Sequence, residues 1–215
     1  MARPKPIICV SHLVGAEGEA VARGVAERLG FRYLDEEIIE TAAEWVDLHP
    51  SVVGDVERHK SLMTRIGESM GRQPTGGRPD ASEQRRSGAT HREMPADEDL
   101  RALIRDAIRD AAEEGDIVIA SHAASVALAE RQDAVRVLVT ASKKVRAGRI
   151  SAARNLDPRR AEKVLAEEDA ARADYLKRFH GVDVELPTHY DLVVNTDNLP
   201  PESAVDLIAL AAGET

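Results

Sequence analysis

A short apolar run followed by a turn with two glycines is the feature that most constrains how this chain can fold. Residues 7–10 (IICV) are apolar, Gly15 and Gly18 lie in the turn that follows, and apolar residues then recur at helical spacing as far as Leu29. This pattern predicts a buried strand, a tight turn and an amphipathic helix. Such a turn offers backbone N–H groups and the positive end of a helix dipole to an anion such as phosphate.

The same turn departs from the commonest phosphate-binding loop. That loop has the form G-x-x-x-x-G-K-S/T, whereas the glycines here are closer together and no lysine follows them. The glycines could also serve only to give a tight turn a backbone conformation that other residues avoid. The sequence therefore leaves two interpretations of this turn, a phosphate loop and a purely structural turn.

Short apolar runs alternate with helical patterns along the rest of the chain, which predicts an α/β fold with a parallel sheet and helices on both faces. Further strands are expected at 31–34, 117–120, 135–140 and 190–195, and helices at 97–114, 123–131, 142–154, 158–178 and 204–211, with two more between 35 and 66. Ligands of such sheets bind beyond the carboxyl ends of the strands.

Polar side chains follow several of the expected strands, and we expect them to converge at that edge of the sheet. They are Ser11, His12, Asp35, Ser121, His122, Thr140, Asn195 and Thr196. Asp35 could instead cap the next helix, and both histidines could simply be hydrogen-bonded at strand ends. No Cys, His or acidic spacing indicates zinc, so no metal site is predicted.

Composition excludes some functions. The formal net charge of −9 argues against general binding to nucleic acids or anionic membranes, which need a basic face. The single cysteine, Cys9, allows no disulfide within the chain and suits a reducing compartment. No apolar segment approaches the length of about 20 residues that a membrane span requires. We therefore expect a cytoplasmic protein without membrane contact.

The stretch 71–96 interrupts the pattern. It is rich in Gly, Pro, Ser and Arg and almost lacks large apolar residues, so burial cannot offset the entropy of ordering it. We interpret it as a flexible insertion in a single domain that covers residues 1–215. It could also be a mobile substrate flap that carries Arg72, Arg78, Arg85 and Arg86.

The ordered set of segments resembles the cytidylate-kinase-like proteins of the P-loop nucleoside monophosphate kinase superfamily. The segments are SHLVGAEGEAVA, VAERLG, YLDEEII, VIASHAA, RVLVTASKKVRAGRI, EEDAARADYLKRFHGVD and YDLVVNTDNLPPESAVDLI. The resemblance covers nearly the whole chain outside 71–96. It implies a three-layer α/β fold in which residues 142–187 form an arginine-bearing helix and a helical lid.

The resemblance also implies a function, the transfer of a phosphoryl group from ATP to a pyrimidine nucleoside monophosphate such as CMP or dCMP, with Mg²⁺. Such catalysis consists largely of positioning and charge neutralisation. The resemblance is also compatible with a homodimer. The implied donor site is Ser11, His12, Gly15, Ala16, Glu17 and Gly18, the implied catalytic group is Arg146, Arg149, Asp169 and Arg172, and Asp35 and His122 would contact the acceptor.

More ordinary roles exist for the implied catalytic residues. Arg146 and Arg149 are three residues apart and could form a solvated helix face. Asp169 and Arg172 have the same spacing and could form an ion pair worth a few tenths of a kcal/mol.

The sequence departs from the family pattern at cationic and glycine positions. Glu17 stands where the pattern has glycine, His12 and His122 stand where it has arginine, and Glu36 also replaces an arginine. Neutral histidine makes no bidentate fork to phosphate, and a carboxylate repels a polyphosphate. Glu17 could also point to solvent from the first helical turn. The alternative function is therefore a catalytically impaired kinase fold that binds nucleotide or a protein partner as a sensor or scaffold.

Overall fold

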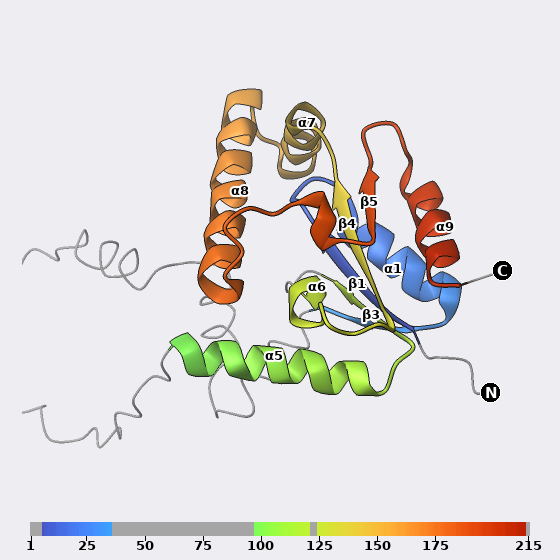
Figure 1. The fold of residues 1–215 in the computed structure, drawn as a ribbon. Coiled ribbons are helices and arrows are strands. Elements are labelled where there is room, and N and C mark those ends of the chain that lie inside the picture. Colours follow the sequence, from blue (N-terminus) through green and yellow to red (C-terminus); the bar gives the residue numbers. More distant parts are fainter. Residues whose placement is uncertain (1–5, 36–96, 121–123, 214–215) are drawn as a thin grey trace, which may run out of the picture.

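The computed structural model describes residues 6–35, 97–120 and 124–213, and a sheet of five parallel strands forms its centre (Figure 1). The strands lie in the order β2-β3-β1-β4-β5. Their bounds are β1 Ile7–His12, β2 Arg32–Leu34, β3 Ile117–Ala120, β4 Ala134–Thr140 and β5 Leu192–Asn195. The chain places later strands on both sides of β1, so the crevice where such sheets bind ligands lies at the carboxyl end of β1.

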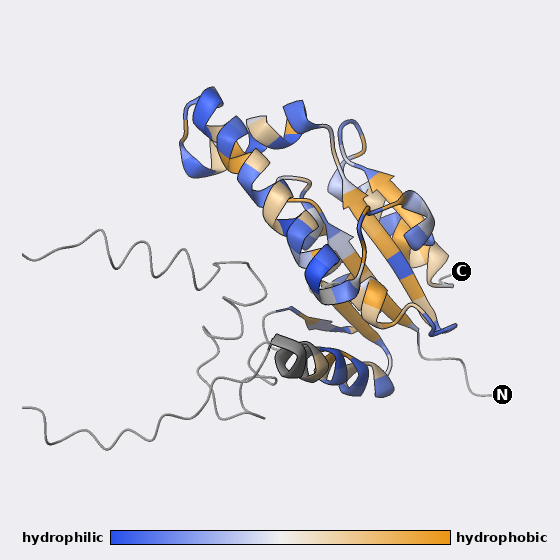
Figure 2. Cartoon of the chain, turned by 60° about the vertical axis from the view of Figure 1, so that its left-hand side comes forward, coloured by the Kyte–Doolittle hydropathy of each residue, from blue (hydrophilic) through white to orange (hydrophobic). Residues whose placement is uncertain are grey.

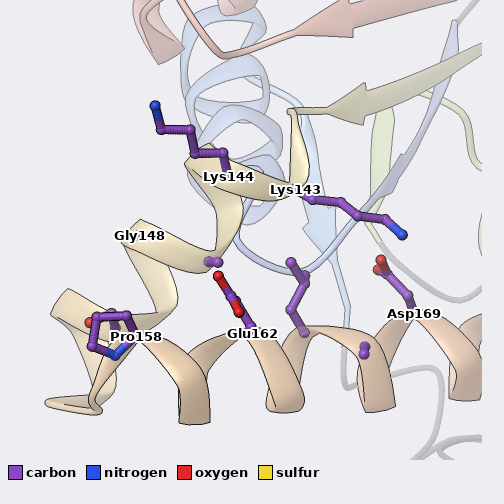
Figure 3. A pocket seen from close by; sticks show the side chains of 10 residues that line it. Lys143, Lys144, Gly148, Pro158, Glu162 and Asp169 are labelled. Atoms are coloured by element: carbon purple, nitrogen blue, oxygen red, sulfur yellow. The ribbon is translucent and has the colours of Figure 1, made fainter.

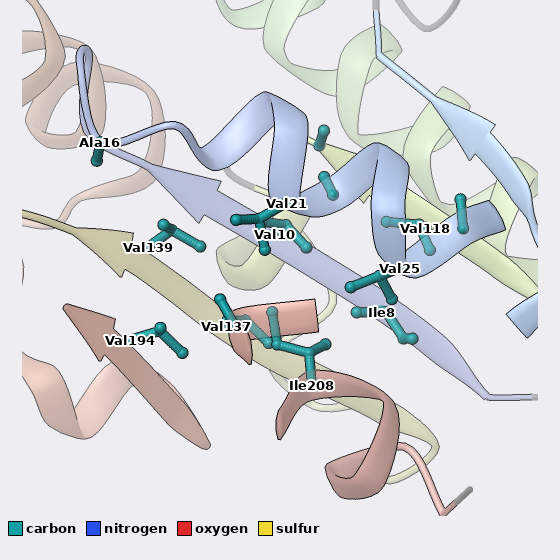
Figure 4. Packing of buried hydrophobic residues seen from close by; sticks show 14 of the residues in the cluster. Ile8, Val10, Ala16, Val21, Val25, Val118, Val137, Val139, Val194 and Ile208 are labelled. Carbon is teal, nitrogen blue, oxygen red and sulfur yellow. The ribbon is translucent and has the colours of Figure 1, made fainter. Parts of the chain in front are cut away.

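Helices cover both faces of the sheet because the strands are apolar on both faces. The helices α1 (Gly18–Leu29) and α9 (Pro201–Ala211) pack on the face that Ile8 and Val10 of β1 present (Figure 4). The helices α5 (Asp97–Glu113) and α6 (Ala124–Ala127) pack on the opposite face, against Ile7 and Cys9. Alternate residues of one strand therefore belong to two cores, as the twofold repeat of a strand requires.

Two further helices, α7 (Lys143–Arg154) and α8 (Pro158–His180), follow β4 and lie beyond the carboxyl edge of the sheet. The Ser142 side chain accepts a hydrogen bond from the Val145 N–H and caps α7, and Asp157 caps α8 in the same way. Figure 2 shows that α8 is largely hydrophilic, whereas the strands are largely hydrophobic. Tyr175 and Leu176 near the end of α8 pack against Val126 of α6.

The structure confirms the parallel sheet with helices on both faces and changes some element bounds. The helix expected at 123–131 is shorter, because a turn begins after Ala127. The last strand begins at Leu192 and not at Tyr190, since a short 3₁₀ helix, Pro187–His189, lies directly before Tyr190. The helices expected between 35 and 66 and the insertion at 71–96 lie outside the described residues. Within the described residues, no helix is long and apolar enough to span a membrane.

Two glycines inside helices provide a test of the packing between α1 and α9. A Cβ built on Gly24 would lie 2.8 Å from Val205 Cγ2, whereas a Cβ on Gly148 of α7 would meet nothing within 4 Å. We expect Gly24→Ala to lower the free energy of unfolding by about 1–3 kcal/mol through overpacking. Gly148→Ala should raise it by about 0.5–1 kcal/mol, because alanine favours the helix. Urea denaturation of both variants measures the difference, and equal effects would contradict the tight contact.

Candidate functional site

The loop between β1 and α1 needs both of its glycines. Gly15 has a φ of +75°, and a Cβ on it would lie 2.9 Å from the backbone oxygen of Arg146. A Cβ on Gly18 would lie only 2.1 Å from the Cβ of His12. Left-handed φ and these close approaches both favour glycine. The loop is thus pressed between the start of α7 and the end of its own strand.

Side chains hold three consecutive carbonyl groups of this loop from one side. Arg146 Nη1 donates to the Val14 oxygen at 3.3 Å, and Arg149 Nη1 donates to the Gly15 oxygen at 3.2 Å. The Thr196 hydroxyl donates to the Ala16 oxygen at 3.0 Å. Within one trans peptide the C=O and N–H groups point in opposite directions. The N–H groups of Gly15 and Glu17 are therefore turned away from these three donors.

The N-terminus of α1 lies at the same place and has no side-chain cap in the structure. The first turn of a helix leaves its N–H groups without intrahelical acceptors and carries the positive end of the helix dipole. The amide side of the loop and this helix end together favour an anion. The geometry is thus suited to phosphate, although no lysine contributes to it.

Glu17 occupies this same helix end in an unusual conformation. Its φ of 62° lies in the left-handed region, which costs a residue other than glycine roughly 1–2 kcal/mol. Its carboxylate lies 3.2 Å from Arg149 Nη2 and therefore pairs with the same α7 arginine that donates to the Gly15 carbonyl. Glu17 does not simply extend into solvent, and a phosphate that reached Arg149 would compete with it.

Arg146 and Asp169 form an ion pair with each other, and the arginine side of this pair is buried. Both guanidinium nitrogens Nη1 and Nη2 donate to the Asp169 carboxylate at 2.7 Å. The Arg146 side chain is only 3% exposed, and its Nε has no hydrogen-bond partner in the structure. The solvated helix face considered for Arg146 is therefore wrong. The pair joins α7, the loop and α8.

The ion pair considered between Asp169 and Arg172 is also wrong, because Arg172 pairs with Glu185. Its Nε donates to one oxygen of Glu185 at 3.0 Å and its Nη2 to the other at 2.6 Å. The Tyr190 hydroxyl donates to the same carboxylate. Glu185 follows α8 in a loop and Tyr190 precedes β5, so no sequence spacing indicates that these residues meet.

His12 lies close to the Arg172 pair. Burial, and next the positive charge of Arg172, lower the pKa of His12 below its usual value, against the opposing effects of Asp35 and Glu19. His12 is therefore largely neutral at pH 7. The charges of Arg172 on α8, Asp35 after β2 and Glu19 on α1 therefore all act on His12 at the end of β1.

The remaining predicted residues have different surroundings. Ser11 is buried, and its hydroxyl contacts that of Ser125 of α6 at 3.1 Å, on the sheet face opposite α1. Asp35 accepts a hydrogen bond from the Tyr33 hydroxyl at 3.3 Å, and the helix it could cap lies outside the described residues. His122 also lies outside them. The sequence predicted Thr196 at the carboxyl edge of the sheet, but it did not predict the hydrogen bond from Thr196 to the Ala16 carbonyl.

A groove of about 510 Å³ lies between α7 and α8 (Figure 3). Small residues such as Gly148 and Ala166 line it, and Figure 3 shows Lys143 extended toward Asp169 at one end. No residue of the loop 13–18 contributes to the groove. The groove is therefore separate from the N-terminus of α1, and Asp169 is one of the residues that line it.

The burial of Arg146 predicts a large difference between two Asp→Asn substitutions. Asp169→Asn removes the charge that balances a buried guanidinium, and we expect a loss of about 3 kcal/mol in the free energy of unfolding. Asp206→Asn removes the partner of Arg28 in a pair that joins α9 to α1, with 44% and 63% of the two side chains exposed. It should cost less than about 1 kcal/mol. Denaturant unfolding measures both values, and a negligible loss for Asp169→Asn would contradict the clamp.

The fold of this protein also occurs in known structures. In two solved structures the same fold recurs: an uncharacterized protein from Eubacterium ventriosum and a shikimate kinase from Bacteroides thetaiotaomicron. The first has a TM-score of 0.65 at 16% identity, covering 98% of this chain and 99% of that chain. The second has a TM-score of 0.52 at 16% identity, covering 96% and 97%. At such identity these likenesses show the fold alone.

Sequence relatives show the family. A curated cytidylate kinase from Sulfurisphaera tokodaii is 31% identical over 104 residues, which cover 48% of this chain and 57% of that protein. The matched part thus spans little more than half of that relative. The sequence model of the cytidylate kinase-like family matches residues 7–198. Because that match covers most of the chain, the protein belongs to the cytidylate kinase-like family.

Proposed function

We propose that this protein transfers a phosphoryl group from ATP to a pyrimidine nucleoside monophosphate of the CMP type. The observation that carries the proposal is the loop Leu13–Gly18, in which side chains hold three carbonyl groups on one side while the N–H groups of Gly15 and Glu17 and the end of α1 remain for an anion. The family and the cytidylate kinase relative support the choice of a nucleotide as substrate.

The residues around the loop fit the phosphates of ATP better than they fit a bare metal ion. Backbone N–H groups of Gly15, Glu17 and Gly18 would hold the donor phosphates, with Arg149 beside them, whereas the Ala16 N–H already donates to the Leu13 oxygen at 3.0 Å. Among the described residues, no group of three or more His, Cys, Asp or Glu side chains could hold a metal ion. Mg²⁺ would therefore take most of its oxygen ligands from phosphates and water, and it would neutralise charge on the transferred group.

The charged side chains have separate roles in this proposal. Arg172 would stabilise negative charge on the transferring group, because its positive charge acts at the end of β1, where it lowers the pKa of His12. Arg146 and Asp169 would hold the loop against α7 and α8, since the pair is largely buried. Asp35 and His122 would contact the acceptor nucleotide.

One observation favours a second function, the binding of nucleotide without transfer. The Glu17 carboxylate pairs with Arg149 at the position where the loop would receive donor phosphates. Glu17 would repel phosphates bound there. It would also neutralise part of the positive charge that Arg149 offers to them. A protein of this kind would act as a nucleotide sensor or as a scaffold for a protein partner.

A turnover assay distinguishes the two functions. The protein is incubated with ATP, Mg²⁺ and each of CMP, dCMP, UMP, AMP and GMP, and ADP formation is followed by a coupled assay. We expect turnover with the pyrimidine nucleotides. A nucleotide-dependent rise in melting temperature without turnover would support the sensor, and the absence of both would overturn the two proposals together.

Glu17 provides the sharpest test of the donor site. We expect Glu17→Gly to tighten ATP binding about tenfold, equivalent to about 1.4 kcal/mol, because the substitution removes a repulsive carboxylate and suits the left-handed backbone. Glu17→Gln should tighten binding less, since it removes only the charge. Glu19→Gln is the matched control: Glu19 is in the same helical turn but pairs with Arg23. Calorimetric titration with ATP measures all three, and equal affinities for wild type and Glu17→Gly would contradict a donor site at this loop.

A further inference from the structure

The segment between α8 and β5 supplies two residues that fix Arg172, namely Glu185, which pairs with it, and Tyr190, which donates to Glu185. Glu185 accepts from two nitrogens of the guanidinium, and the two side chains are only 20% and 18% exposed. A two-point contact of this kind fixes the plane of a guanidinium as well as its place. Arg172 is therefore held in one orientation by a residue thirteen positions further along the chain.

Tyr190 fixes the other side of this contact. Its hydroxyl donates to the Glu185 carboxylate, and burial together with that carboxylate raises the pKa of Tyr190 to about 12. The hydroxyl therefore stays a donor throughout the physiological range. Burial by itself would raise the pKa of Glu185, but the hydrogen bonds from Arg172 and Tyr190 keep it below its usual value. Glu185 thus stays an anion.

The place where Arg172 is held is the carboxyl end of β1. Arg172 lies near enough to His12 to affect its protonation, and Tyr190 lies beside Ser11, the residue that precedes His12. Tyr190 itself directly precedes Asp191 and β5, so this end of the grip is anchored to the sheet. The segment 181–190 therefore connects the helix that carries Arg172 to the amino end of β5, and the Tyr190 side chain reaches Ser11 near the carboxyl end of β1.

We propose that Glu185 and Tyr190 are positioning residues for Arg172, whose guanidinium they hold in one orientation near the carboxyl end of β1 before a ligand binds. The proposal rests on the function proposed above for its catalytic meaning, but the placement of Arg172 is a property of the free protein. A cation that is already oriented need not be ordered during the reaction, which is how preorganised charge lowers a barrier. Glu185 would act through Arg172 and would not itself contact substrate.

The protonation of His12 reports the placement without any substrate. The charges that face His12 are Arg172 from α8, Asp35 after β2 and Glu19 from α1. If Glu185→Gln releases Arg172, a positive charge moves away from His12 and the pKa of His12 rises. If Arg172 stays in place, the loss of a negative charge nearby leaves that pKa unchanged or lowers it. The two outcomes differ in sign.

The experiment is an NMR pH titration of the free protein, with the His12 signal assigned through its loss in His12→Gln. We expect an upward shift of the His12 pKa in Glu185→Gln and a smaller upward shift in Tyr190→Phe, which also covers the case in which the first variant fails to fold. Asp191→Asn is the control, because it breaks a similar two-point pair with Arg136 in the adjacent position. It should leave the His12 pKa unchanged. No shift, or a downward shift, in the Glu185 and Tyr190 variants overturns the proposal.

Kinetics then test the catalytic meaning. With the best acceptor found in the turnover assay, Glu185→Gln should lower kcat about tenfold with little change in the KM for ATP, because the loop that binds ATP is untouched. Glu185→Asp should restore part of the loss, and Asp191→Asn should retain wild-type kcat. An upward His12 shift without an effect on kcat would keep the placement but overturn the positioning role, whereas absence of turnover in the wild type would overturn only the proposed function.

Discussion

The contact between the β1–α1 loop and the first turns of α7 is the interaction on which the rest of the site depends. Gly15 packs directly on the backbone of Arg146, and no side chain larger than hydrogen fits there without displacement. That approach lets Arg146 and Arg149 reach successive loop carbonyls. Once the carbonyls are held, the N–H groups of Gly15 and Glu17 point the other way, which is the side that the proposed function assigns to an anion.

Charge pairing is the second constraint on the site. Each of the three arginines around the loop binds a carboxylate of the protein itself: Asp169, Glu17 or Glu185. The pairs differ in burial and therefore in consequence. In the Arg146 pair the guanidinium is nearly inaccessible, and the pair acts as a structural clamp. The Arg149 pair is more exposed, so an anionic ligand can compete for it.

Much of the framework could be predicted from the sequence because it depends on local pattern. The alternation of apolar runs and helical spacing predicted the five-stranded parallel sheet, and the glycine pair marked the turn after β1. Ser142 and Asp157 were recognisable as helix starts for the same reason, since a cap acts within one turn. The sequence could not decide between the alternative roles of Arg146 and Asp169, because the burial of these side chains depends on how α7 and α8 pack together.

The sequence by itself therefore determined the fold class and the family. Only the tertiary structure decided which carboxylate neutralises which arginine, since spacing suggested Asp169 with Arg172 and the packing joined Asp169 to Arg146 instead. It also brought Glu185 and Tyr190 to Arg172. The physical reason is range: strand, helix and cap preferences act over a few residues, whereas an ion pair forms between whichever charges the packed helices bring together.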